Sequence, residues 1–390
     1  MSAVADNHES LIQGDFYTVN FQKGAREGTL ILNMGPQHPS THGVLRVLLE
    51  LDGEYVVRAE PVLGYLHRMH EKMGEVKTPA QYIPNMGRVD YLHALAWNWA
   101  YVGAVERLAG MEVPERAEYL RVITTELNRI SSHLVWWGTY ILDLGAFTPV
   151  LYAFDDREEV LDILQMITGS RLTYSYFRFG GVYNDAPPEF FERVRTFVKT
   201  MRKRLGMYKD LVTENVILRN RLEGIGVADT STCLRYGATG PVLRASGVRH
   251  DVRRAEPYSV YDRFDFDIPT RPEGCSFARY MVRMEEMEQS LRILEQAVEG
   301  IPEGPVNPAK RPRFNFKLPP GETCFAVEGA RGKVKVWLVS DGGKTPYRIK
   351  LRSPCFSNLS LFPEVARGTL IADSVAILGS LDLVIPELDR

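Results

Sequence analysis

Cysteine is scarce in this 390-residue chain, which has only Cys233, Cys275, Cys324 and Cys355. These residues lie dozens of positions apart, and no two of them form a CxxC pair. Such spacing excludes the disulfide framework of a small secreted protein, a zinc knuckle, and an iron–sulfur cluster held by this chain alone. We therefore expect a reducing, cytoplasmic setting and no metal site of the chain's own.

Long apolar runs are missing as well. The first ten residues, MSAVADNHES, carry acids and no apolar core, which is unlike a secretory signal. The nearest candidate for a membrane span runs from Leu134 to Phe154, but it contains Asp143, two glycines and Pro149. A transmembrane helix needs about 20 predominantly apolar residues, so we expect a buried helix that ends in a loop.

An excess of charge of either sign is also lacking. The 47 basic and 49 acidic side chains leave a formal net charge of −2. The field of the whole molecule is therefore too weak to attract nucleic acid or an anionic membrane, and partner recognition must depend on local patches. The 45% hydrophobic content can fill a sizeable core, in one large or two ordinary domains.

The order of apolar patterns along the chain predicts an α+β fold. Residues 1–28 are polar and without pattern, and we expect an extended arm. Residues 29–61 alternate around Asp52-Gly53, a dipeptide of tight hairpins, which predicts an antiparallel sheet. Apolar residues then recur every three or four positions, which predicts a helical bundle over 62–300. Its expected helices are Val89–Leu108, Pro114–Leu142, Asp156–Ile167, Pro188–Val216 and Phe277–Val298.

The C-terminal part returns to turn and strand patterns. Residues 301–322 are rich in proline, lysine and arginine, and we expect a loop that wraps a partner. Residues 323–390 open with a predicted hairpin over Thr323–Ser340 that turns near Gly329–Gly332. A further strand at Tyr347–Leu351 and a short helix near Ala366–Leu378 complete the expected elements.

Histidine is concentrated near the N-terminus, where five of the eight residues lie between positions 38 and 93. His38 and His42 stand in NMGPQHPSTHGVLRV, a Gly/Pro-punctuated stretch that displays both imidazoles on a loop. Zinc binding has a weak case, because Pro39 interrupts any helix and no cysteine is near. For His67 and His70, three residues apart on an expected helix, hydrogen bonding is favoured over metal ligation.

Several polar residues have both an ordinary and a functional interpretation. Asp143 lies among apolar residues in TYILDLGAF, where a lone carboxylate is costly, so we expect a histidine or arginine partner. The alternative is a helix-terminal residue bonded to backbone donors beyond Gly145. Tyr91 alone fits a core tyrosine whose hydroxyl finds a carbonyl. Arg68 and Arg88 fit surface or salt-bridge positions unless a buried anion faces them.

Five motifs occur in the order GPQHPSTHG, GYLHRMHEK, RVDYLHA, LDLGAFTP and EGARG. In this order they resemble the 49 kDa quinone-site subunit of respiratory complex I, over about Thr29 to Arg390. The resemblance implies a mainly α-helical bundle of the nickel–iron hydrogenase large-subunit type, with small antiparallel β-sheets from the N- and C-terminal parts. It also implies partners: a cluster-bearing subunit, a 30 kDa-type subunit, a ferredoxin-like subunit and a membrane subunit at the quinone entrance.

The related hydrogenases hold nickel with the motifs RxCGxC and DPCxxC. Here Leu63 and Leu66 replace the first pair of cysteines, and Val384 and Glu387 replace the second. Nickel needs soft thiolate ligands, and aliphatic side chains offer no lone pair, so we expect no nickel. The resemblance implies that the vacated cleft accepts the quinone headgroup.

The resemblance also assigns roles to individual residues. It implies that His42 and Tyr91 donate to the two quinone carbonyl oxygens, and that Asp143 pairs with His42. His38 belongs to a loop expected to rearrange when quinone binds. Reduction to quinol takes two electrons and two protons, so proton donors are needed where charge builds on the oxygens.

The terminal 4Fe–4S cluster is expected to be ligated by a partner subunit, with Arg68 and Arg88 beside it. Family members whose cluster is pH-sensitive have a histidine where this chain has Thr173. Threonine cannot take up a proton, so we expect a nearly pH-independent, lower cluster potential and a menaquinone-type rather than ubiquinone-type acceptor. The ending VIPELDR differs from the usual VxGExDR of the family, and His70 receives no role.

We therefore expect a subunit of a proton-pumping NADH:quinone oxidoreductase, peripheral on the cytoplasmic side of the bacterial inner membrane and active only within the complex. A relative driven by coenzyme F420 or ferredoxin is one alternative, since the electron donor depends on the partner subunits. A purely structural subunit with no site of its own is another. A membrane-bound hydrogenase is disfavoured because its thiolates are missing.

Overall fold

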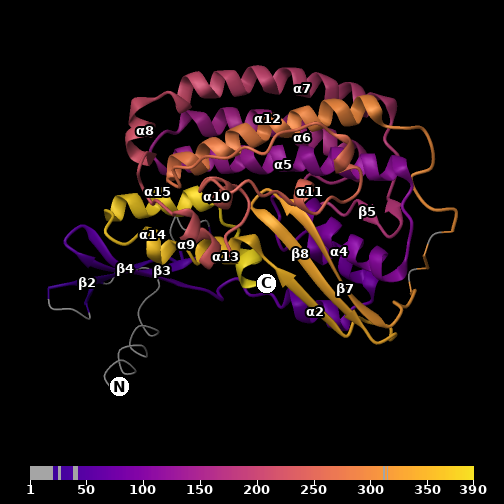
Figure 1. Ribbon diagram of the computed structural model, residues 1–390, viewed down its shortest axis with the longest axis horizontal. Helices are drawn as coiled ribbons and strands as arrows, with labels where there is room; N and C mark the ends of the chain where they lie inside the picture. Colours follow the sequence, from indigo (N-terminus) through magenta and orange to yellow (C-terminus); the bar gives the residue numbers. More distant parts are fainter. Residues whose placement is uncertain (1–20, 25–27, 38–42, 311, 314) are drawn as a thin grey trace.

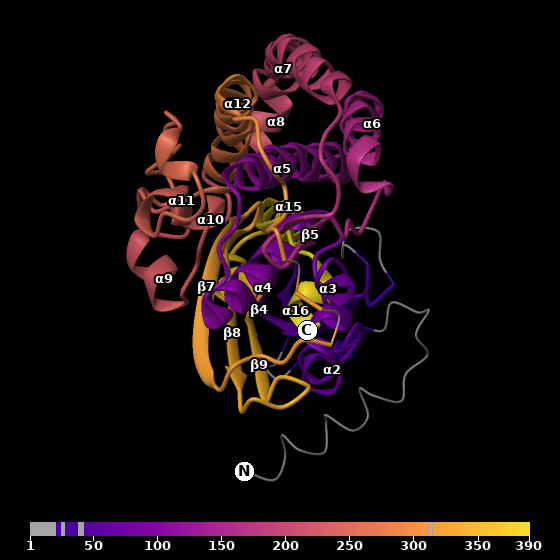
Figure 2. The same ribbon diagram turned by 90° about the vertical axis from the view of Figure 1, so that its right-hand side faces the viewer.

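The computed structural model describes residues 21–24, 28–37, 43–310, 312–313 and 315–390. The four longest helices form a bundle along one side of the molecule, and a four-stranded and a three-stranded antiparallel sheet lie below it (Figure 1, Figure 2). The expected α+β fold, mainly helical with sheets from the N- and C-terminal parts, is confirmed.

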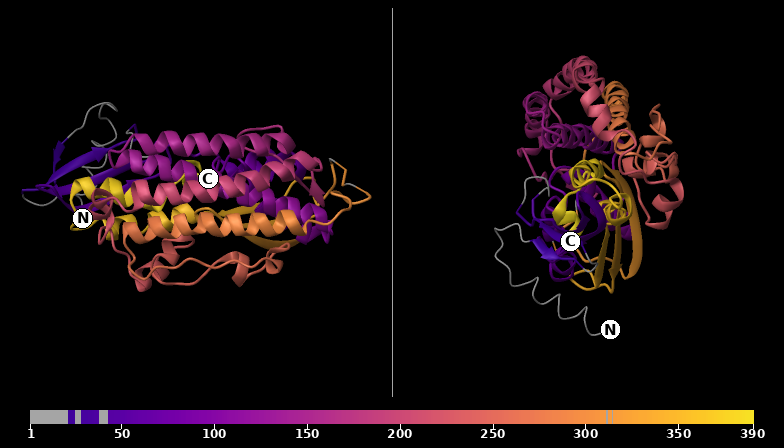
Figure 3. Two further views of the ribbon diagram at one scale, coloured as in Figure 1. Left: turned by 90° about the horizontal axis from the view of Figure 1, so that it is seen from above. Right: turned by 90° about the vertical axis from the view of Figure 1, so that its left-hand side faces the viewer.

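The bundle consists of α5 (Glu115–Asp143), α6 (Thr148–Thr168), α7 (Pro188–Tyr208) and α12 (Ser276–Gly300), which run side by side (Figure 3). Helix α5 is central, because it is buried on nearly every side and packs against both α6 and α12. Proline in the first turn of α6 and α7 suits positions whose N–H groups have no helical partner. Apolar periodicity predicted these helices, although α6 begins earlier than the expected Asp156, after a short connection at 144–147.

The N-terminal sheet has four antiparallel strands in chain order: β1 (Phe21–Lys23), β2 (Leu30–Met34), β3 (Arg46–Asp52) and β4 (Tyr55–Val62). The predicted turn at Asp52-Gly53 joins β3 to β4, and Gly53 has a φ of 59°, which glycine adopts without strain. Val47 and Leu49 of β3 belong to one apolar cluster with the C-terminal helices α14 (Phe362–Val365) and α15 (Ile371–Leu381). Strand β1 lies within residues 1–28, so the sheet begins earlier than predicted.

The C-terminal sheet consists of β7 (Gly321–Gly329), β8 (Gly332–Ser340) and β9 (Arg348–Arg352). The hairpin of β7 and β8 forms where the sequence predicted it, with Ala330 and Arg331 at its tip. Helix α4 (Ala94–Ala109) packs against both strands (Figure 2). This packing is close: a Cβ atom on Gly103 would lie 2.6 Å from the Phe325 ring. The hairpin tip is thereby brought to the start of α4.

Three further local predictions are wrong. The helix expected over Pro188–Val216 ends at Tyr208, where a π-helix of five residues follows. The helix expected from Val89 begins at Ala94, because the Asp90 side chain holds a turn ahead of α4. His67 and His70 do not share a helix, since α2 (His70–Val76) begins only at His70. Met69 before it has a φ of 52°, a left-handed conformation that interrupts the helix.

The shorter elements connect these layers. They are α3 (Pro79–Met86), β5 (Phe177–Arg178), β6 (Gly181–Val182), the π-helix η2 (Lys209–Thr213), α8 (Val216–Leu222), α9 (Thr230–Arg235), α10 (Pro241–Arg244), α11 (Val252–Ala255), the 3-10 helix η3 (Tyr261–Arg263), α13 (Pro354–Leu359) and α16 (Ile385–Asp389). Within the described residues, no helix combines the length and the apolar character that crossing a bilayer requires.

Candidate functional site

Tyr91 lies in a tight turn that leads into α4. The Oδ1 atom of Asp90 accepts the backbone N–H groups of Leu92 and His93, each at 3.0 Å, so the turn closes around Tyr91. The Tyr91 residue is 36% exposed, whereas Asp90 and His93 are buried. Burial, and then the negative charge of Asp90, raise the pKa of the Tyr91 phenol. The phenol therefore stays protonated at neutral pH and can donate a hydrogen bond.

A buried arginine holds this turn from the interior. Nη1 of Arg331, at the tip of the β7–β8 hairpin, donates to Oδ2 of Asp90 at 3.0 Å and to Oγ of Ser132 at 3.0 Å. Nη2 of Arg331 donates to Asp382 at 3.1 Å. Burial opposes a charged guanidinium, but the carboxylates of Asp382 and Asp90 outweigh it and raise the pKa of Arg331. The sequence analysis did not identify this group of interacting side chains, although Asp90 lies in the motif VDYLHA and Arg331 in the motif EGARG.

The segments that correspond to the two hydrogenase cysteine motifs lie together in the structure. The Asp389 carboxylate accepts the N–H of Gly64 at 2.9 Å and the N–H of Leu66 at 2.7 Å. Leu66 also packs against the apolar cluster that contains Val384. The two segments are therefore adjacent, and Leu63, Leu66 and Val384 in them carry aliphatic side chains, whereas Glu387 carries a carboxyl.

Glu387 is a buried acid within the second of these segments. It accepts hydrogen bonds from Oγ of Ser353 at 3.0 Å and from the thiol of Cys355 at 3.3 Å. Burial, and then the negative charge of Asp90, raise the pKa of Glu387 to about 7, partly offset by the positive charge of Arg331. This interior carboxyl, near the Asp90–Arg331 ion pair, therefore gains and loses a proton around neutral pH.

Asp143 is the last residue of α5 and is partly buried. The N–H groups of Gly145 and Ala146 bond to carbonyls of the last helical turn, in the usual glycine-ended arrangement. These two backbone donors are thus used to end the helix. His38 and His42 lie outside the described residues, so the pairing of Asp143 with His42 stays a prediction.

Arg68 and Arg88 are both exposed. Arg68 follows the segment that Asp389 binds, and Arg88 lies just ahead of the Tyr91 turn, where Nη1 donates to the carbonyl of Pro84. Burial, and then the positive charge of Arg68, lower the pKa of His70 to about 4, so its imidazole is neutral. Both arginines carry positive charge at the surface.

An apolar cavity of about 330 Å³ lies beside the loop that follows Asp143. One wall is the connection from α5 to α6, including Phe147, and the other is formed by η2 and α8. Phe147 and Ile217 are more than half exposed. The cavity can hold an apolar group, and Thr148, Asn215 and Arg221 are its polar members.

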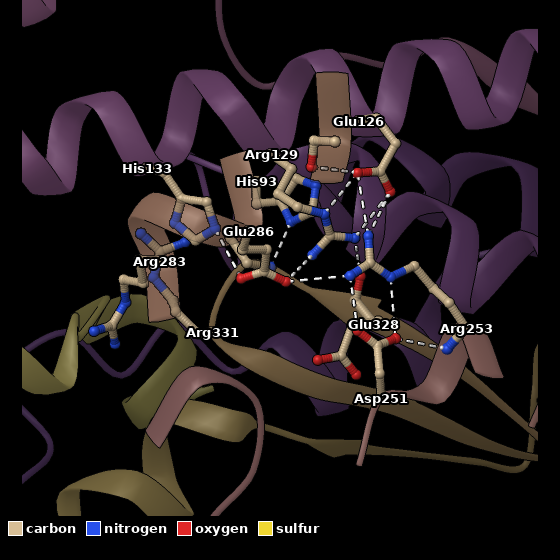
Figure 4. A network of polar contacts seen from close by, with 12 residues as sticks. His93, Glu126, Arg129, His133, Asp251, Arg253, Arg283, Glu286, Glu328 and Arg331 are labelled. Carbon is tan, nitrogen blue, oxygen red and sulfur yellow. Dashed lines mark hydrogen bonds and ion pairs between the residues drawn. The ribbon is translucent and has the colours of Figure 1, made fainter. Parts of the chain in front are cut away.

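An ionic network fills the interior behind Arg331 (Figure 4). Its members are Glu126, Arg129, Arg244, Asp251, Arg253, Glu286 and Glu328. Carboxylate oxygens of Asp251, Glu286 and Glu328 lie within 4.8 Å of one another, a spacing that a metal ion could use. However, Arg244 donates to Glu328 at 2.8 Å and to Glu286 at 3.0 Å, so guanidinium already supplies the positive charge. We interpret the cluster as a structural ion-pair network.

Comparison with known proteins identifies relatives over most of the chain. Residues 143–314 and 310–390 match the family model described as "Respiratory-chain NADH dehydrogenase, 49 Kd subunit". An NADH-quinone oxidoreductase subunit of Desulfotalea psychrophila is 62% identical over 362 residues, which cover 93% of this chain and 97% of that protein. The corresponding subunit of Opitutus terrae is 61% identical over 362 residues, which cover 93% of this chain and 90% of that protein. The subunit of Geobacillus thermodenitrificans is 52% identical over 365 residues, which cover 93% of this chain and 99% of that protein.

Proposed function

This chain belongs to the 49 kDa subunit family of the respiratory NADH dehydrogenases, and we propose that it reduces quinone within a proton-pumping NADH:quinone oxidoreductase. The proposal depends most on Tyr91, a protonated and partly exposed phenol in a turn tied to a buried ion pair. It is further supported by the segments whose hydrogenase counterparts bind nickel, which are joined here through Asp389.

The chemistry proposed for these residues is proton donation to a bound quinone. Tyr91 donates to one carbonyl oxygen, and His42, backed by Asp143, donates to the other. A phenol and an imidazole that are already oriented stabilise negative charge as it develops on the oxygens. The apolar cavity beside the loop that follows Asp143 offers an apolar surface close to the acid of the proposed pair.

Electrons are proposed to come from a 4Fe–4S cluster of a partner subunit. The four cysteines of this chain, all among the described residues, are free and stand on separate elements, so they supply no ligand set. The positive charges of the exposed Arg68 and Arg88 would favour the reduced, more negative form of a neighbouring cluster. With Thr173 in place of a histidine, the cluster potential is proposed to be low and to suit a menaquinone.

The chain is a subunit of a hetero-oligomeric oxidoreductase, and the finer assembly is part of the proposal. We propose a position on the cytoplasmic face of the bacterial membrane, peripheral to the bilayer. Its proposed neighbours are the cluster-bearing subunit, the 30 kDa-type subunit, the ferredoxin-like subunit and the membrane subunit at the quinone entrance. Movement of residues 35–43 on quinone binding would signal to the membrane arm.

Replacement of Tyr91 by phenylalanine in the complete complex tests this function. Loss of a positioned proton donor is expected to lower quinone reduction by roughly 100-fold, while NADH still reduces the clusters. Tyr347→Phe, at an exposed tyrosine on the C-terminal sheet side, is the matched control and should leave turnover unchanged. Turnover of Tyr91→Phe at the level of the native complex would remove Tyr91 from the mechanism.

A further inference from the structure

We propose that Arg331 is a positioning residue for quinone reduction, acting through Asp90 to hold the Tyr91 turn in its productive place. This inference rests on the proposed role of Tyr91 and adds to it the group that fixes that residue. Arg331 is 1% exposed, so it acts through the turn rather than by touching quinone.

The turn itself depends on one carboxylate. Oδ1 of Asp90 bonds to the N–H groups of Leu92 and His93, and these bonds define the backbone path on both sides of Tyr91. Oδ2 of the same carboxylate faces Nη1 of Arg331 at 3.0 Å. Any rotation of the Asp90 side chain away from Arg331 would therefore also release the turn.

Residues of several helices and loops hold Arg331 in place. Its side chain donates to Asp382, which follows α15, and to Ser132 of α5. Its carbonyl accepts Nδ2 of Asn358 from α13 at 3.2 Å. A Cβ atom on Gly240 would lie 2.5 Å from this carbonyl oxygen, which shows how closely the neighbouring backbone approaches. The guanidinium is therefore a rigid anchor with little freedom to follow the turn.

A second hydrogen bond joins the same hairpin tip to the same turn. The N–H of Ala330 donates to Nδ1 of His93 at 2.8 Å. Because a backbone N–H can only donate, Nδ1 of His93 must be the acceptor, and the proton sits on Nε2, which faces the Thr125 carbonyl at 3.2 Å. Burial lowers the pKa of His93, in agreement with a neutral ring. The hairpin tip thus holds the Tyr91 turn at two points.

The charges also fit a positioning role. Asp90 and Asp382 are buried on either side of Arg331, and an uncompensated buried carboxylate is costly. Loss of the guanidinium would leave two facing acids without their shared cation, and Asp90 would have to turn toward solvent or another donor. Displacement of a reacting group by about 1 Å can cost two orders of magnitude in rate.

A double-mutant cycle in the complete complex tests the proposal. The variants are Arg331→Lys, Tyr91→Phe and the pair together, assayed with NADH and a short-chain quinone analogue. Arg331→Lys keeps the charge but loses the fork that bridges two carboxylates, and we expect kcat to fall roughly tenfold with little change in KM. In the Tyr91→Phe background the same substitution should change kcat by less than about twofold, because its effect passes through Tyr91.

The possible outcomes distinguish the positioning role of Arg331 from the proposed role of Tyr91. If Tyr91→Phe lowers turnover and Arg331→Lys lowers it by the same factor in both backgrounds, the positioning role is wrong while the role of Tyr91 stands. If Tyr91→Phe leaves turnover unchanged, both ideas are wrong. An unaltered kcat for Arg331→Lys alone would also overturn the positioning role.

Two further variants guard against a simple folding defect. Asp90→Asn keeps Oδ1 as the acceptor of the turn but removes the charge that faces Arg331, and we expect the same dependence on Tyr91. Arg121→Lys is the matched control, because Arg121 is 1% exposed and paired with Glu106 at 2.6 Å, away from the turn. It should lower thermal stability but leave kcat per assembled complex unchanged.

Discussion

The Asp389 carboxylate accepts the backbone N–H of Leu66 at 2.7 Å, a contact between residues 323 positions apart. Its other oxygen accepts the N–H of Gly64 at 2.9 Å. The end of the chain is thereby joined to the segment that carries thiolates in hydrogenases. Two hydrogen bonds to one carboxylate hold these two segments together.

Asp389→Asn is expected to loosen this junction. An amide has one acceptor oxygen instead of two, so one of the two backbone donors loses its partner, at a cost of about 1–3 kcal/mol. We expect a lower midpoint of thermal inactivation of the complex and a raised KM for quinone. Asp210→Asn, at an exposed position, should change neither. An unchanged midpoint for Asp389→Asn would show that the junction is held by other contacts.

Glu387 is expected to make stability depend on pH. Its pKa is raised from 4.5 to about 7, so the folded state binds a proton that the unfolded state releases. The contribution of this group to stability therefore falls as pH rises from about 4.5 to about 7. Glu387→Gln mimics the protonated form and should reduce the loss of thermal stability between pH 5 and pH 8. Parallel pH curves for the variant and the native complex would contradict the assignment.

Thr173→His is expected to make the partner's cluster potential depend on pH. Thr173 has a φ of 50°, a conformation that histidine adopts more readily than a β-branched residue, so the change should be accommodated. Redox titration should give a slope approaching about 59 mV per pH unit for the variant and almost none for the native complex. Thr173→Asn, which suits the same backbone but cannot ionise, is the control and should stay flat. A full slope in the native complex would refute the prediction.

Asp143→Asn is expected to shift the pH dependence of quinone reduction. If Asp143 supports a charged imidazole at His42, loss of the carboxylate makes that imidazole give up its proton more easily. Turnover should then begin to fall at a lower pH than in the native complex, with a smaller effect in acid. Asp143→Glu, which retains a carboxylate, should restore part of the native profile. An unshifted profile in Asp143→Asn would exclude the pairing.

Local pattern was sufficient for most of the long helices. Apolar spacing predicted α5, α7 and α12, because a helix that packs in a bundle must repeat its apolar residues every three or four positions. The Asp52-Gly53 turn and the β7–β8 hairpin were predicted for a similar local reason. The errors occur where local geometry overrides periodicity: the Asp90 carboxylate closes a turn ahead of α4, and the left-handed Met69 interrupts the expected helix around His67.

The residues of the candidate site were also identified partly from the sequence and partly only from the structure. The amino-acid sequence by itself determined the family through its motifs, because the order of motifs can be recognised without knowing any tertiary contact. The same motifs identified Tyr91 and Asp143 as candidate site residues. Only the tertiary structure decided which charges meet: Asp90, Arg331 and Asp382 are far apart in the chain but adjacent in space. No local pattern encodes such a set, since a buried charge is tolerated only where the packing of distant elements supplies its partner.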